Sequence, residues 1–278
     1  MPAPRSLQLI LLMFKLVMAL MLSTPMIRAL TILAYGDSLT YGWSAGGRSE
    51  TPYANMLQQT LSERDVKATV HHWGGPGKTA RELVDPGLGG PKGQNGIVTM
   101  LRKYIHMNDN SPLVCVILIG TNDLAQIGWG ATPASIFSDI KSLHELAKGE
   151  GARTLAVTLP SNGVGARFPD AEKARLEVNE RMRSELDVVF EFPFSFSVTS
   201  ALYDADQLHF SPSGYEALGR ALAEPIIKDF LPPPKGEDAP FDGLTCGAFK
   251  MQQLKGGEQQ IRIAKFLAER EEEKGDND

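Results

Sequence analysis

Four short segments of this chain carry the residue types that acyl transfer requires. They are residues 36–39 (Gly-Asp-Ser-Leu), 77–79 (Gly-Lys-Thr), 120–123 (Gly-Thr-Asn-Asp) and 206–209 (Asp-Gln-Leu-His). Acyl transfer by a hydroxyl needs a nucleophile, a base, an acid that orients the base, and donors that bind an oxyanion. Because each segment supplies one or two of these parts, the set predicts a serine-dependent hydrolase.

Ser38 is the candidate nucleophile, and His209 with Asp206 is the candidate base and its orienter. Ser38 follows an apolar run and a Gly-Asp step, where glycine allows a sharp turn that exposes a hydroxyl. Asp206 precedes His209 by three residues, within reach of the imidazole, whose tautomer a carboxylate fixes. Asp204 is the competing orienter, but its five-residue offset suits this geometry less well. The alternatives are a helix-capping role for Ser38 and a plain loop position for His209.

The candidate oxyanion donors are Ser38, Gly77 and Asn122. A glycine lets a substrate oxygen approach a backbone N–H closely, and an asparagine amide adds a neutral side-chain donor. The alternatives are an ordinary turn at Gly77 and a helix cap at residues 121–123. No His or Cys cluster has metal-ligand spacing, so neither a metal nor a cofactor is expected.

Alternating strand and helix patterns must position these segments. Strands are predicted at residues 31–35, 67–73, 113–119, 153–159 and 188–192. Helices are predicted at residues 52–64, 97–107, 133–148 (capped by Thr132), 169–186 and 213–230. This order predicts an α/β fold, a three-layer α/β/α sandwich with a central parallel sheet of about five strands. The first three catalytic segments each follow a strand, so they are expected at carboxyl ends, where open α/β sheets build their sites.

The 278 residues, 42% of them apolar, suit one hydrolase domain, predicted over residues 30–231. Before it, a basic residue, an apolar stretch at residues 7–22 and a small residue at position 29 predict a signal peptide over residues 1–29 and a secreted protein. The alternative is an uncleaved membrane anchor at residues 7–22, the one route to membrane contact. A run of prolines opens a polar C-terminal extension over residues 232–278, with a candidate helix at residues 259–273.

The net charge bears on the binding partners, and the positions of the two cysteines bear on the state of their thiols. The net charge of −5 gives no basic surface for a nucleic acid, so no nucleic-acid partner is expected. Cys115 lies in an apolar run and is predicted to be a buried thiol, whereas Cys246 lies in the extension.

In order and content, the four segments resemble those of the SGNH, or GDSL-type, esterase and lipase family, which has a flavodoxin-like fold. The matching positions are Ser38, Gly77, Asn122, and His209 with Asp206. Residues 211–215 (Ser-Pro-Ser-Gly-Tyr) also resemble the start of the last helix of that family, and the likeness spans residues 31–230. The sequence departs from the family at residue 72, where a histidine replaces the usual asparagine.

The resemblance implies a carboxylic ester hydrolase that acts through an acyl-enzyme on a small-molecule ester, without a cofactor. No Leu/Phe-rich lid is visible, which favours short or soluble acyl esters. The alternatives within the fold are a lysophospholipase or lipase and a carbohydrate acetylesterase. Residues 42–48, 85–96 and 161–169 are the loops expected to line the substrate site.

Two alternative functions belong to other functional classes. One is an inactive secreted binding module on the same fold, because a fold does not guarantee activity. The other is a nucleotide-binding protein, because residues 72–79 nearly match the phosphate-binding pattern Gly-x4-Gly-Lys-Thr. His72 replaces the first glycine of that pattern, which leaves the phosphate cradle incomplete.

Overall fold

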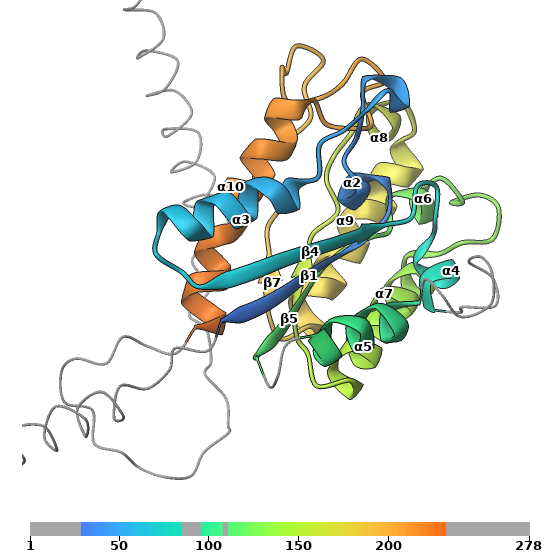
Figure 1. Cartoon of the computed structure of the whole chain (residues 1–278). Helices are drawn as coiled ribbons and strands as arrows, with labels where there is room; N and C mark the ends of the chain where they lie inside the picture. The colour runs from blue at the N-terminus through green and yellow to red at the C-terminus, as the bar shows by residue number, and fades with distance from the viewer. Residues whose placement is uncertain (1–28, 85–95, 108–110, 232–278) are drawn as a thin grey trace, which may run out of the picture.

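A five-stranded parallel sheet forms the centre of the computed structural model, which describes residues 29–84, 96–107 and 111–231 (Figure 1). In spatial order the strands are β4 (Ala68–Gly74), β1 (Leu30–Gly36), β5 (Leu113–Leu118), β6 (Arg153–Val157) and β7 (Val189–Phe190). Each neighbouring pair is parallel. This order is the flavodoxin-like one, whose ligand site lies where the chain switches sides, here between β1 and β5.

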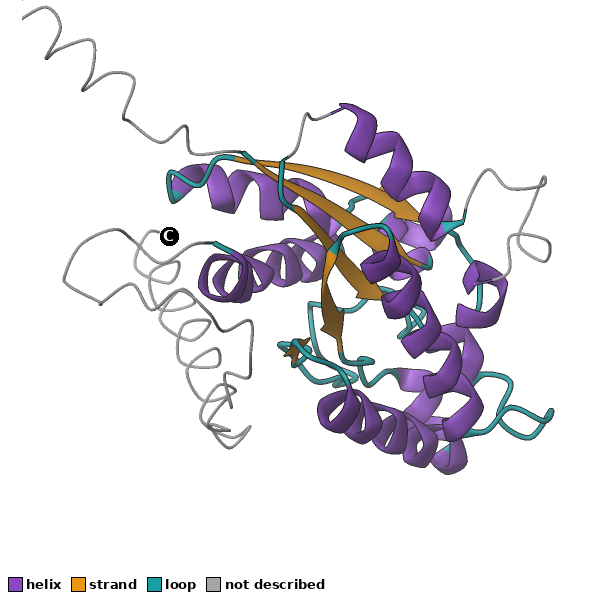
Figure 2. Cartoon of the chain, turned by 90° about the horizontal axis from the view of Figure 1, so that it is seen from below, coloured by secondary structure: helices purple, strands orange, loops and turns teal. Residues whose placement is uncertain are grey.

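Helices cover both faces of the sheet, so the predicted three-layer α/β/α sandwich is confirmed (Figure 2). One face carries α3 (Tyr53–Glu63) and α10 (Pro212–Phe230), and the other carries α5 (Ile97–Met107), α7 (Pro133–Gly149) and α9 (Pro169–Glu185). Alternate residues of β1 serve the two cores: Ile32 packs with α3 and α10, and Leu33 packs with α5 and α7. Because both faces are covered, β1 and β5 are buried along their whole length.

The two C-terminal strands are shorter than predicted, because side chains take over their hydrogen bonds. β6 ends at Val157, and the N–H of Leu159 donates to Asn179 Oδ1 at 2.8 Å instead of to a strand. The N–H of Phe192 likewise donates to Thr158 Oγ1 at 2.8 Å, beyond the end of β7. The positions of these two strands along the chain were therefore predicted correctly, but both predictions extend too far at the carboxyl end.

Helix α7 begins with the capping residue and the proline that the sequence predicted. Thr132 caps α7 in a capping box with Ser135, and a proline occupies the first turn. Several short elements were not predicted, because a few residues carry no periodicity. They are α2 (Ser38–Tyr41), the hairpin β2 (Trp43–Ser44) and β3 (Ser49–Glu50) with the 3₁₀ turn η1 (Ala45–Gly47), α4 (Ala80–Val84), α6 (Thr121–Leu124) and α8 (Gly163–Arg167).

Several predictions fall outside the described residues. They are the signal peptide (except residue 29), the C-terminal extension with Cys246, and the loop predicted at residues 85–96 (except residue 96). Of the other two expected loops, residues 42–48 contain β2 and η1, and residues 161–169 contain α8. Within the described ranges no helix is both long enough and apolar enough to cross a membrane. Cys115 is a free, fully buried thiol as predicted, and burial raises its pKa.

Candidate active site

The ends of three adjacent strands bring the first three candidate catalytic segments together. Gly36, at the end of β1, pairs with Gly74 of β4 on one side and with Leu118 of β5 on the other. The turns that follow, including α2 and α6, therefore lie at one edge of the sheet (Figure 1). Glycine is required at this junction: an added Cβ on Gly36 would lie 1.9 Å from Leu118 O, and one on Gly74 would lie 2.2 Å from Tyr41 N.

Ser38 is the first residue of α2, and its hydroxyl is not used as a cap. Asp37 is the cap instead, because its Oδ1 accepts the N–H of Leu39 at 2.9 Å. The capping alternative for Ser38 is therefore wrong, and the hydroxyl is left for other partners. Asp37 is fully buried, and its Oδ2 has no hydrogen-bond partner among the described residues. Burial raises the pKa of Asp37 to about 7, and the nearby charge of Asp123 adds to the rise.

A continuous hydrogen-bonded chain joins Ser38, His209 and Asp206. Ser38 Oγ lies 2.9 Å from His209 Nε2, and His209 Nδ1 lies 2.7 Å from Asp206 Oδ2. The other carboxylate oxygen, Oδ1, accepts the backbone N–H groups of Leu208 and His209, each at 2.9 Å. Partial burial opposes ionisation of this carboxyl, but the hydrogen bonds from His209 and the two N–H groups outweigh it and lower the pKa of Asp206.

Asp204, the competing orienter, makes different contacts. Its Oδ1 accepts the N–H of Ala205, and its backbone N–H donates to the carbonyl of His209 at 2.8 Å. Asp204 therefore closes the loop around His209 through its main chain, while the side chain on the imidazole belongs to Asp206. The structure thus joins Asp206, the predicted partner, to His209.

The loop that carries Asp206 and His209 is held by the chain that follows β6. Tyr203 Oη donates to Ser161 O at 2.7 Å, and the N–H of Gly163 donates to Gln207 O at 2.7 Å. Gln207 has a φ of 62°, in the left-handed region that a non-glycine residue rarely adopts, so these contacts must maintain it. The position of His209 therefore depends on residues 161–163.

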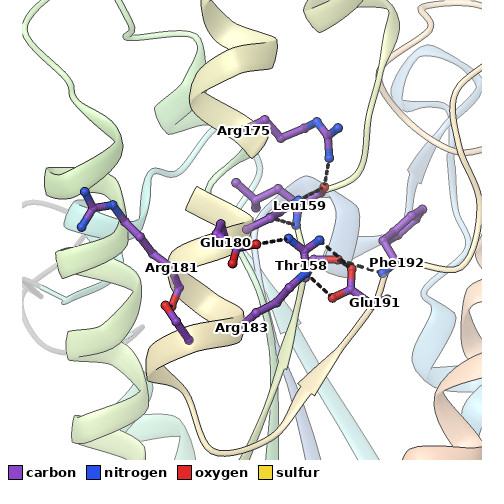
Figure 3. Close-up of polar contacts among 10 residues, drawn as sticks. Thr158, Leu159, Arg175, Glu180, Arg181, Arg183, Glu191 and Phe192 are labelled. Atoms are coloured by element: carbon purple, nitrogen blue, oxygen red, sulfur yellow. Dashed lines mark hydrogen bonds and ion pairs between the residues drawn. The ribbon is translucent and has the colours of Figure 1, made fainter. Parts of the chain in front are cut away.

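The chain on either side of those residues makes polar contacts to α9 (Figure 3). Arg175 Nη1 donates to Leu159 O at 2.9 Å, just before residues 161–163. Lower on the same helix, Arg183 forms two hydrogen bonds with Glu191, at 2.6 and 2.9 Å, beyond the end of β7. A helix far from the nucleophile in sequence thus holds the end of the β6 segment at Leu159, two residues before Ser161.

The three candidate oxyanion donors lie on the adjacent turns. The backbone N–H groups of Ser38 and Gly77 have no acceptor among the described residues. Gly77 is exposed, with a φ of +76° that favours glycine. Asn122 Nδ2 donates to Lys78 O at 2.8 Å, which places this amide beside the Gly77 turn and leaves its second N–H for another acceptor.

Trp43 is a site residue that the motif analysis did not single out. Its ring centre lies 6.1 Å from that of His209. Tyr215 Oη donates to Trp43 O at 2.7 Å, and Gly47 lies so close that an added Cβ would be 2.4 Å from the indole. The available sequence signal was its position, five residues after Ser38. His72, the departure from the family pattern, is half-buried in β4, and burial lowers its pKa.

The same turn explains why residues 72–79 are a poor phosphate cradle. In a phosphate-binding loop, backbone N–H groups at the following helix start face the anion. Here the N–H of Thr79 donates to the Glu82 carboxylate at 3.0 Å, and the N–H of Ala80 donates to the Asp123 carboxylate at 3.0 and 3.1 Å. Because carboxylates of the chain occupy these donors, the arrangement argues against the nucleotide-binding alternative.

Comparison with known proteins gives a family match over most of the chain. The model of the GDSL-like lipase/acylhydrolase family matches residues 34–217. No curated protein matches at a significant level.

Solved structures with a similar fold include a carbohydrate acetylesterase family member from Sinorhizobium meliloti, with 23% identity over 72% of this chain and 98% of that one and a TM-score of 0.53. They also include the psychrotrophic esterase EstA from a Pseudoalteromonas species, with 16% identity over 71% of this chain and 97% of that one and a TM-score of 0.50. At these identities the likeness extends to the fold alone.

Proposed function

This chain belongs to the GDSL-like lipase/acylhydrolase family and is a serine esterase, and on that premise we propose that it hydrolyses short or soluble carboxylic esters through an acyl-enzyme on Ser38. The observation that carries the proposal is the unbroken chain of contacts from Asp206 through His209 to Ser38 Oγ. Proton transfer requires this spacing, which allows the imidazole to take the hydroxyl proton without rearrangement.

The proposed reaction has two halves. Ser38 Oγ attacks the ester carbonyl while His209 Nε2 takes its proton, and the oxyanion that forms is bound by the N–H groups of Ser38 and Gly77 and by the Asn122 amide. His209 then gives the proton to the departing alcohol, which leaves the acyl group on Ser38. Water attacks the acyl-enzyme with His209 again as the base, and the carboxylic acid leaves. Asp206, whose lowered pKa favours the ionised carboxylate, stabilises the imidazolium in both halves.

The preference for short acyl groups rests on Trp43. Its ring is tilted against that of His209, so it restricts the space on that side of the reacting centre. The hydrogen bond from Tyr215 Oη holds the main chain of Trp43, and Gly47 packs closely against the indole itself. A rigid aromatic wall beside the base suits a small or planar group better than a long flexible chain.

One observation favours a second candidate, a lysophospholipase or lipase. Three large apolar side chains are exposed on the loops that follow β5, β6 and β7: Trp129 (89% exposed), Phe168 (60%) and Val198 (76%). Loops at the carboxyl ends of the strands surround the site, so apolar groups there suit an amphiphilic substrate. A carbohydrate acetylesterase, the third candidate, agrees with the short-acyl preference and differs only in the alcohol.

An acyl-chain series tests the substrate class. With nitrophenyl esters of two to sixteen carbons, kcat/KM should be highest for acetate or butyrate and fall as the chain lengthens, because Trp43 limits the space beside His209. Trp43→Ala should move the optimum to longer chains. An optimum at twelve or more carbons in the unaltered enzyme would contradict the proposal and favour the lysophospholipase reading. Labelling of Ser38 by a fluorophosphonate separates both from an inactive binding module.

Asn122 should contribute through the transition state rather than through substrate binding. Asn122→Ala is expected to lower kcat by about 10²–10³-fold, the usual scale for one lost oxyanion donor. KM should change much less, because the amide acts on charge that develops only in the transition state. Steady-state kinetics of the folded variant measures both. A normal kcat with a raised KM would show that Asn122 binds ground-state substrate or only supports the turn.

A further inference from the structure

The Gly77 turn is anchored by two neighbouring side chains of α6, and one of them has no role in the reaction described above. Asn122 Nδ2 donates to Lys78 O at 2.8 Å. Both carboxylate oxygens of Asp123 accept the N–H of Ala80, at 3.0 and 3.1 Å. We propose that Asp123 is a positioning residue that holds the Gly77 N–H in register with the other oxyanion donors. This inference rests on the proposed function.

Gly77 needs such an anchor because its side-chain position faces open space. It is exposed, and an added Cβ would meet no atom within 4 Å. Its left-handed φ of +76° also lies in a region from which glycine moves easily. The direction of its N–H must therefore be set by the residues on either side.

Upstream, the turn is fixed to the strand that carries the nucleophile. The N–H of Gly75 donates to Gly36 O at 2.9 Å, and the N–H of Lys78 closes the turn by donating to Gly75 O at 3.0 Å. Gly36 precedes Ser38 by two residues, so this anchor relates the turn to Ser38. Downstream, Asp123 relates the same turn to Asn122, the adjacent residue. Between them the two anchors relate Gly77 to both other proposed donors.

The Asp123 contact is strong because it is buried and charged. Asp123 is 5% exposed and Ala80 is fully buried, so water does not compete for the hydrogen bond. Burial raises the pKa of Asp123 to about 6. The hydrogen bond from the Ala80 N–H lowers this pKa, and the negative charges of Asp139 and Glu82 raise it further. Above that pH the carboxylate is ionised and binds the N–H through both oxygens.

The test compares two variants at Asp123 with a matched control. Asp123→Ala removes the anchor and should lower kcat on a short nitrophenyl ester by about 10²-fold, with KM changed by less than about threefold, the pattern of a misplaced oxyanion donor. Affinity for a trifluoromethyl ketone, which forms an oxyanion adduct with the serine, should fall in parallel. Asp123→Asn keeps one accepting oxygen and should lose only about 3- to 10-fold in kcat.

Asp139→Asn is the control, because Asp139 also contacts α4, through an ion pair with Arg81 at 3.2 Å, but does not reach the Gly77 turn. Well above pH 6, where Asp123 is ionised with or without the charge of Asp139, its kcat should match that of the unaltered enzyme. A folded Asp123→Ala enzyme with unchanged kcat, or with a loss confined to KM, would overturn the positioning role. If Asp123→Ala fails to fold, unchanged kcat and ketone affinity in Asp123→Asn would overturn it, and a selective loss of both would support it.

The same experiment separates this inference from the proposed function. If the unaltered enzyme hydrolyses the ester and Ser38→Ala does not, the proposed function stands, and the Asp123 variants judge the positioning role alone. If the unaltered enzyme hydrolyses no ester in the series, the proposed function is refuted and the positioning role falls with it.

Discussion

Replacing Ser38 with alanine should lower kcat for ester hydrolysis by at least about 10³-fold and by up to roughly 10⁶-fold, while the protein stays folded. The loss is large because the acyl-enzyme cannot form without the hydroxyl, and His209 then has no nucleophile to activate. The fold should persist, because the start of α2 is capped by Asp37 rather than by Ser38. Hydrolysis of nitrophenyl acetate and a thermal melt of the purified variant measure the two expectations.

Ser44→Ala is the matched control for this experiment. Ser44 is also a buried serine near the site, but its hydroxyl bonds to Ser49 within the β2–β3 hairpin, at 2.7 Å between the two Oγ atoms. Its activity should remain close to that of the unaltered enzyme. Ester hydrolysis by a Ser38→Ala preparation that contains no unaltered enzyme would contradict the proposed mechanism.

The second large effect is expected at Asp206. Asp206→Asn should lower kcat by roughly 10⁴-fold, the scale of the same change in the Ser-His-Asp triad of a serine protease. The side-chain shape is kept, but an amide can donate to His209 Nδ1 and favour the tautomer in which Nε2 carries the proton. In that tautomer Nε2 cannot accept the proton of Ser38. The variant also lacks the charge that stabilises the imidazolium.

Asp204→Asn tests whether the choice between the two carboxylates is correct. Asp204 lies in the same loop but contacts the Ala205 N–H rather than the imidazole, so its variant should keep kcat within about threefold of the unaltered enzyme. Measured over a range of pH, the Asp206 variant should remain slow even where imidazole is neutral. Equal losses in the two variants would show that the loop as a whole, rather than Asp206 in particular, supports catalysis.

Most of the scaffold followed from patterns in the sequence. The apolar run at β5 predicted a strand buried on both faces, and the Thr132-Pro133 pair predicted the start of α7. Such features are local, because a few consecutive residues determine them. The ends of β6 and β7 were predicted too far along, since Asn179 and Thr158 take hydrogen bonds that a strand would otherwise use. Those partners are remote in sequence, and no pattern within the strand reveals them.

For the site, the sequence by itself determined which residue types are available and in what order: a serine, a glycine, an asparagine, and a histidine with an aspartate three residues before it. Only the tertiary structure decided how they are used. It put the Asp206 carboxylate on the imidazole and left Ser38 free by giving the cap to Asp37. It also placed Trp43 beside His209 and joined Asp123 to Ala80. The physical reason is that hydrogen bonds and ring contacts act over a few ångströms in space, and residues so placed can be far apart along the chain. Ser38 and His209 meet only because the sheet and α10 bring the two ends of the domain to one edge.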